Sequence, residues 1–144
     1  MSYCESFQAS YARCNIDEDF LTFFLKHFCS TNPRFSERFF GVDNEKQTRM
    51  LKASIILVQN ASDNPFIRNN VKNLATRHKD MNLNIKPEEL VAWQESLLAT
   101  VANFDPLFDD EIDQAWRSML ELGLEIMSKH AIANPMSEMV NKTV

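Results

Sequence analysis

Glycine is scarce in this chain, and its scarcity argues against a β-rich fold. Only two of the 144 residues are glycine, Gly41 and Gly123. A β-rich fold of this length would normally need more glycine for its tight turns. A nucleotide cradle would need a glycine-rich loop, and the chain has none. The sequence therefore predicts an all-α protein without a nucleotide-binding loop.

Paired cysteines and long apolar runs are also missing. Cys4, Cys14 and Cys29 are odd in number and lack CxxC spacing, which favours reduced, structural thiols over a disulfide frame or a zinc site. Apolar runs such as 54–58 are far too short to span a membrane. The first residues lack the positive and apolar regions of a signal peptide, so we expect a cytoplasmic protein.

Positive charge is in deficit. The net charge is −5 and no basic patch interrupts it, which argues against nucleic acid or an anionic membrane as a partner. The acidic segment 108–113 lacks the alternating oxygen donors and the central glycine of a calcium loop. We interpret it as the acidic first turn of a helix, where negative charge complements the helix dipole.

Apolar residues at helical spacing are present along nearly the whole chain. Eleven phenylalanines and seven methionines make a bulky interior, which suits a helical core or a large planar ligand. Together with breaks at proline, asparagine and aspartate, the spacing predicts about six long helices and one short corner helix. The expected long helices cover residues 4–14, from the Asn15 cap to just before Asn32-Pro33, from the Asp43 cap to about 60, 65–78, 87–104, and from Asp109 or Asp110 to about 130; residues 33–41 are expected to form a turn with a single helical turn in it.

These elements predict a single domain over residues 1–144, with ordered helices over about 4–130 and a loose tail over 133–144. Asn15 and Glu18 match a capping-box pattern at the start of the second helix. Asp43 is the expected cap of the fourth element, and Asp109 or Asp110 begins the last.

Among the three histidines, His78 is the strongest candidate for a functional residue. It follows Val71 and Leu74 at spacings of seven and four, on the apolar stripe of its helix. Such a histidine is more often a core residue than a ligand, so spacing alone leaves both interpretations open. His27 and His130 have weaker claims. No histidine pair stands at helical ligand spacing, so a zinc or di-iron helical site is not expected.

Several short segments occur together in one order and register. They are Leu74 to His78, Ile85 to Leu90, Glu95 to Thr100, the pair Ala115-Trp116, the pair Asn32-Pro33 followed by Phe39, and Gln47 with Leu51. Over about residues 4–130 this pattern resembles the globin family, in particular bacterial single-domain haemoglobins and the globin domain of flavohaemoglobins. The resemblance implies a globin fold around a pocket for haem b.

The resemblance also implies roles for particular residues. His78 would be the iron's fifth ligand through a ring nitrogen, and Phe39 would stack on the porphyrin. Gln47 and Leu51 would overhang the sixth position, where the Gln47 amide would donate a hydrogen bond to dioxygen. The other haem contacts that it implies are Phe24, Leu25, Leu74, Ile85 and Leu97.

Three departures from the flavohaemoglobin pattern matter for function. Leu25 stands where bacterial relatives usually carry a tyrosine, so very slow oxygen release is not expected. Leu90 and Ala131 stand where a tyrosine and a glutamate increase the basicity of the proximal histidine. No reductase domain accompanies these 144 residues, so we do not expect a self-sufficient nitric-oxide dioxygenase.

The leading functional hypothesis is reversible binding of dioxygen, or of NO or CO, at a His78-ligated haem. Slow nitric-oxide dioxygenation with an external reductase is an alternative, and so is a globin-like sensor or regulatory interaction domain, with or without haem. A peroxidase would need a titratable distal group, which Gln47 does not supply. The sequence also leaves a homodimer open.

Overall fold

The structure is a computed structural model that describes residues 2–38, 43–61, 64–80 and 86–131. Within these ranges every regular element is a helix, so the all-α prediction is confirmed. The helices are α1 (Tyr3–Cys14), α2 (Glu18–Thr31), α3 (Pro33–Arg38), α4 (Asn44–Asn60), α5 (Pro65–Asp80), α6 (Pro87–Phe104) and α7 (Asp110–Ala131). No helix in these ranges is long and apolar enough to cross a membrane. The predicted tail, 133–144, lies outside the described residues.

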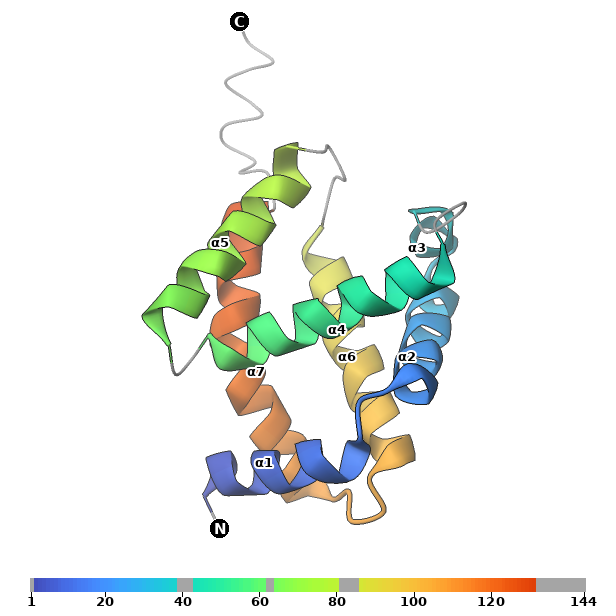
Figure 1. Cartoon of the computed structure of the whole chain (residues 1–144), viewed down its shortest axis with the longest axis vertical. Helices are drawn as coiled ribbons and strands as arrows, with labels where there is room; N and C mark the ends of the chain where they lie inside the picture. The colour runs from blue at the N-terminus through green and yellow to red at the C-terminus, as the bar shows by residue number, and fades with distance from the viewer. Residues whose placement is uncertain (1, 39–42, 62–63, 81–85, 132–144) are drawn as a thin grey trace, which may run out of the picture.

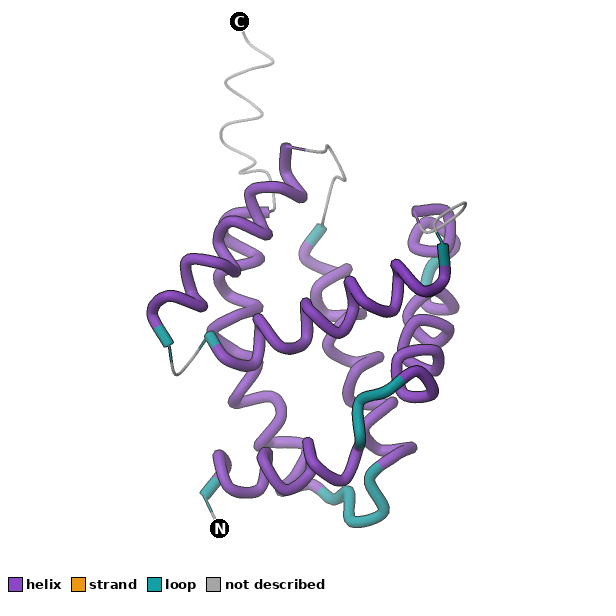
Figure 2. The backbone as a smooth tube through the Cα atoms, viewed as in Figure 1, coloured by secondary structure: helices purple, strands orange, loops and turns teal. Residues whose placement is uncertain are grey.

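Helix α7 is the longest element and contacts α1, α4, α5 and α6, while α2 packs on α6 (Figure 1). Helix α4 ends and α5 begins on the same side of the molecule, and the two helices diverge from there, α4 extending back toward α3 and α5 rising toward the top of the view (Figures 1 and 2). The start of α6 lies between their diverging ends in this view. Helix α4 crosses in front of α6 and α7 in this view, and it contacts α7 as well as α5.

Local capping explains where the helices begin and end, and it corrects the capping-box prediction. Asn15 ends α1 in the left-handed region (φ 47°), which asparagine tolerates better than most residues. Asp17 is the N-cap of α2, and its carboxylate accepts from the backbone N–H groups of Asp19 and Phe20. At the start of α7 the Asp109 carboxylate accepts from the Ile112 N–H at 2.9 Å, in agreement with the acidic-first-turn prediction.

The main hydrophobic core joins α1, α2, α6 and α7 through aromatic side chains. Phe7, Phe20, Phe24 and Trp116 are fully buried in it. The Phe7 and Trp116 rings pack edge to face with centroids 4.8 Å apart, a favoured geometry for aromatic pairs. The Trp116 indole N–H donates to the Ser10 hydroxyl at 2.9 Å, so its polar atom is satisfied inside the core.

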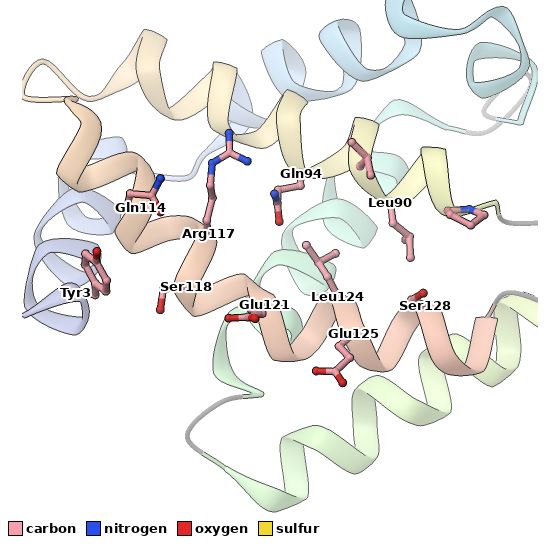
Figure 3. A pocket seen from close by; sticks show the side chains of 12 residues that line it. Tyr3, Leu90, Gln94, Gln114, Arg117, Ser118, Glu121, Leu124, Glu125 and Ser128 are labelled. Atoms are coloured by element: carbon pink, nitrogen blue, oxygen red, sulfur yellow. The ribbon is translucent and has the colours of Figure 1, made fainter.

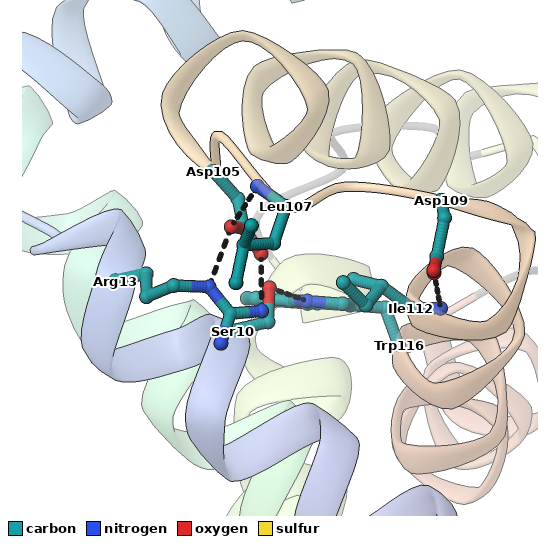
Figure 4. A network of polar contacts seen from close by, with 7 residues as sticks. All are labelled: Ser10, Arg13, Asp105, Leu107, Asp109, Ile112 and Trp116. Carbon is teal, nitrogen blue, oxygen red and sulfur yellow. Dashed lines mark hydrogen bonds and ion pairs between the residues drawn. The ribbon is translucent and has the colours of Figure 1, made fainter.

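A polar network fastens α1 to the connection between α6 and α7 (Figure 4). Arg13 donates two hydrogen bonds to the fully buried carboxylate of Asp105, from Nε at 2.6 Å and from Nη2 at 2.9 Å. The Leu107 N–H donates to the same carboxylate at 2.9 Å. Burial alone would raise the pKa of Asp105, but hydrogen bonds from Arg13, Ser10 and the Leu107 N–H lower it below its ordinary value.

All three cysteines lie in described segments and are free thiols. Cys14 is buried, and burial raises its pKa to about 11, which keeps it a neutral structural thiol. Cys29 is half-buried, and burial raises its pKa as well. Cys4 is exposed, so the expectation of three structural thiols is wrong for that residue.

Helices α4 and α7 approach each other closely at Gly123. A Cβ on Gly123 would lie 2.6 Å from the Val58 carbonyl oxygen and 2.9 Å from the Val58 Cα. Because these are backbone atoms, the clash is relieved only if the helices move apart. We expect Gly123→Ala to lower the free energy of unfolding by about 1–3 kcal/mol, despite the higher helix propensity of alanine, worth about 1 kcal/mol.

Urea denaturation measures this effect. Ser118→Ala, at an exposed position of the same helix, is the control and should change stability by less than about 0.5 kcal/mol. A Gly123→Ala variant more stable than the natural chain would show that α4 and α7 are not in close contact there.

Candidate functional site

Helix α4 supplies one wall of the candidate site. Gln47 and Leu51 lie one turn apart on it, each with 7% of its surface exposed, and Ile55 follows one turn later with none. Spacings of four put the three side chains on one face of the helix. Gln47 is thus a polar side chain on an otherwise apolar, inward-facing stripe.

Helix α2 supplies an aromatic wall. Phe24 is fully buried and Leu25 is half-buried against the same core. The Phe24 ring packs edge to face on Trp93 of α6, with centroids 5.6 Å apart. Phe28, one turn further along α2, stacks on Phe35 of α3 at 4.5 Å. The side chains of this wall are large and apolar, as the predicted distal pocket requires.

Helix α6 adds Leu97, which is fully buried, and Trp93, which is half-buried. Neither Trp93 nor Phe28 was among the predicted site residues, although both contact Phe24 or its neighbours. The signal for Trp93 was present in the sequence, because it lies one turn before Leu97 on the apolar stripe of the predicted helix.

Helix α5 carries the predicted iron ligand. His78 lies in this helix one turn after Leu74, while its side chain lies outside what the structure describes. Leu74 is half-buried in a second, smaller core cluster, where α5 packs on α7 and on the start of α6 through Val71, Ala75, Met127 and Leu90. Phe39 and Ile85 lie outside the described residues, and so does the Ala131 side chain. The role of His78 stays a prediction.

An ion pair connects α3 with α6. Arg34 of α3 lies 3.0 Å from the buried carboxylate of Glu89 in the first turn of α6. In sequence, Phe39 directly follows α3 and Ile85 precedes α6 by two residues. The pair therefore joins α3 to the first turn of α6.

The other two histidines lie away from these walls. The Nδ1 atom of His27 is 2.9 Å from the hydroxyl of buried Ser96, and its ring is stacked near Phe23 at 6.4 Å. His130 is half-buried in the last turn of α7. His27 thus has a structural hydrogen bond between α2 and α6. Nothing in these contacts gives either residue the inward position expected of His78.

The seven helices and their two core clusters define an all-α protein in the described residues, and comparisons with known proteins identify its family. The family model described as Globin matches residues 18–125. The chain belongs to the globin family, and the predicted fold is thereby confirmed.

A solved structure agrees with this assignment. The protein PA3967 of Pseudomonas aeruginosa PAO1, described as structurally highly homologous to a human hemoglobin, matches with a TM-score of 0.81 and 27% identity. The match covers 92% of this chain and 100% of that protein. A search of curated proteins gave no significant match.

Proposed function

We propose that this globin binds haem b with His78 as the iron's proximal ligand and reversibly binds a diatomic gas, dioxygen first. Haem iron supplies the open coordination position at which such a gas binds. The observation that carries the proposal is the division of the described core into two clusters, one that joins α2 and most of α4 to α6 and α7, and one that joins α5 to the last part of α7 and the end of α4. Each cluster has half-buried apolar side chains at its margin.

These marginal side chains fit a flat, apolar prosthetic group. Leu25 and Trp93 are half-buried at the margin of the first cluster, and Leu74 and Leu90 at the margin of the second. A planar apolar group between the clusters would bury all four, at about 25 cal/mol for each Å² removed from water. His78 follows Leu74 by one helical turn, which is the position an axial ligand on the α5 side requires.

On the side of the proposed haem opposite α5, the predicted contacts come from α2 and α4. Among these contacts, Gln47 is the residue whose side chain can donate a hydrogen bond. The other predicted contacts on these two helices, Phe24, Leu25 and Leu51, are apolar and would keep water out of the pocket. The Gln47 amide would donate to dioxygen, which accepts hydrogen bonds better than carbon monoxide does. An amide does not titrate, so this site favours ligand binding over acid–base chemistry.

A haem titration of the purified chain tests the proposal. We expect a Soret band that saturates at one haem per chain, and a ferrous form whose spectrum shifts reversibly with dioxygen. Absence of saturable, stoichiometric binding would overturn the proposal and favour a haem-free interaction domain.

Gln47→Leu tests the distal assignment. Loss of one hydrogen bond, worth about 1–1.5 kcal/mol, should speed dioxygen dissociation about tenfold. Carbon monoxide dissociation should change far less. The control is Gln59→Leu, the same change at a second buried glutamine of α4, which should leave both rates within about twofold. Stopped-flow kinetics on the ferrous protein measures both rates. Equal acceleration for the two gases would show that Gln47 acts by bulk alone.

A further inference from the structure

A groove of about 750 Å³ lies between the first half of α6 and the part of α7 from Gln114 to Ser128, and it shares Leu90 with the proposed haem site (Figure 3). Toward its end α7 packs on α5 instead, since Met127 is buried against Val71 and Ala75. Leu90 and Leu124 lie between α6 and α7 and form an apolar floor. The groove is therefore a consequence of α7 leaving α6 to cover α5.

The groove has exposed apolar side chains at its borders. Tyr3 is 51% exposed and Val91 is 60% exposed, and both line it. With Leu90 and Leu124 between them, these side chains give the groove an apolar lining along its length, and an exposed apolar lining is typical of a surface that another molecule covers.

The charges of the lining are unbalanced. Arg117 is neutralised by Glu95 at 2.7 Å and by Asp113 at 2.8 Å. Glu121 and Glu125 line the groove one turn apart, and neither forms a hydrogen bond or ion pair with another residue in the described part of the chain. An apolar floor beside two uncompensated carboxylates complements a partner that is apolar on one side and positively charged beside it.

We propose that this groove binds an amphipathic helix of another protein, with an apolar stripe flanked by lysine or arginine. The lining runs along α7 from Gln114 to Ser128, about 21 Å at 1.5 Å per residue, and matches a helix of about 14 residues. An apolar helix face in an open groove is a common recognition mode. The chain's net charge of −5 favours the same partner.

Two other occupants fit less well. A second copy of this chain placed symmetrically on the groove would bring Glu121 and Glu125 against their own counterparts, which is repulsive. Residues 132–144 contain one glutamate and one lysine, Glu138 and Lys142, whose charges cancel. That segment therefore has no net positive charge to pair with Glu121 and Glu125.

The test uses the full chain and a synthetic 14-residue helical peptide of leucine and lysine, with a matched peptide in which glutamate replaces lysine. At moderate salt we expect the lysine peptide to bind at least about tenfold more tightly by calorimetry. Amide NMR shifts should be largest at Gln94, Leu124 and Ser128. Shifts spread evenly over the acidic surface would overturn the proposal.

Charge-reversed variants separate the groove from general acidity. Glu121→Lys/Glu125→Lys should weaken the lysine peptide at least about tenfold, and so should Val91→Asp, which removes an apolar border residue. The control Glu18→Lys/Glu45→Lys, in a second concavity between α2 and α4, makes the same change in net charge. It should weaken binding less than about threefold.

Three further outcomes would overturn the proposal. Equal weakening in both double variants would show binding without a specific site. Much tighter binding after removal of residues 132–144 would show that this segment is the occupant. Concentration-dependent dimerisation abolished by Glu121→Lys/Glu125→Lys would assign the groove to a second copy.

Discussion

Replacing His78 by alanine is expected to abolish stoichiometric haem binding, or to leave haem that is held only in the presence of added imidazole. The imidazole of His78 is the proposed bond between protein and iron, and free imidazole can replace it in the space that the shortened side chain leaves. Alanine has the highest helix propensity, so α5 should remain folded. Haem content and the Soret spectrum, with and without imidazole, measure the loss of haem binding and its rescue. Circular dichroism measures whether the helices remain folded.

The controls are the other two histidines. His27→Ala should cost stability, because Ser96 would lose its 2.9 Å hydrogen-bond partner, but haem content should stay at one per chain. His130→Ala should leave haem content and spectrum unchanged. An unaltered Soret band in the His78→Ala protein would contradict the proximal assignment.

Replacing Asp105 by alanine is expected to cause the largest loss of stability, about 3–5 kcal/mol at neutral pH. The change leaves the Arg13 guanidinium without its bidentate partner and the Leu107 N–H without its 2.9 Å acceptor. The Asp105 side chain is fully buried, so water does not replace these bonds. The free energy of unfolding of a typical domain is about 5–15 kcal/mol, so this loss would be a large fraction of it. Urea denaturation at neutral pH measures it.

The same residue predicts a pH dependence. The pKa of Asp105 is lowered in the folded state, so its stabilisation is present above its ordinary value, 3.8, and is lost as the pH falls through the lower folded value. The difference in stability between the natural chain and Asp105→Asn should therefore be constant above about pH 5 and shrink below pH 3.8. A difference that stays constant at acid pH would mean that the charge of Asp105 contributes nothing.

Glu95→Ala is the matched control for Asp105→Ala. It also removes a carboxylate that is paired with an arginine, Arg117 at 2.7 Å, but the Glu95 side chain is 50% exposed. Exposed ion pairs contribute about 0–1 kcal/mol, so this variant should lose little. Similar losses in the two variants would show that burial does not set the strength of the Asp105 pair.

The helices could be predicted from the sequence because their signals are local. Pro65 and Pro87 begin α5 and α6 as expected, and Asp105-Pro106 follows the end of α6. Helix α5 runs to Asp80, two residues past its expected end, since no glycine or proline stops it there. The capping box at Asn15 was wrong because that residue ends the preceding helix. Propensity and capping act within about one turn, where the sequence can be interpreted directly.

The candidate site could be predicted only in part. Burial of Gln47, Leu51, Phe24 and Leu97 agrees with their helical spacing, while their haem contacts remain proposals. The role of His78 depends on resemblance as well as spacing, because an apolar stripe alone does not distinguish an axial ligand from a core residue. The external reductase, the homodimer and the cytoplasmic location stay predictions.

By itself, the sequence determined the helical class, the helix order and the residues that face inward, because scarce glycine, proline breaks and apolar spacing act on neighbouring residues. Only the tertiary structure decided which distant residues meet. Arg13 pairs with Asp105 across 92 positions and Trp116 with Ser10 across 106. The Gly123–Val58 contact and the α6–α7 groove likewise depend on how the helices cross. Crossing angles follow from the packing of many side chains together, so no single segment of the chain encodes them.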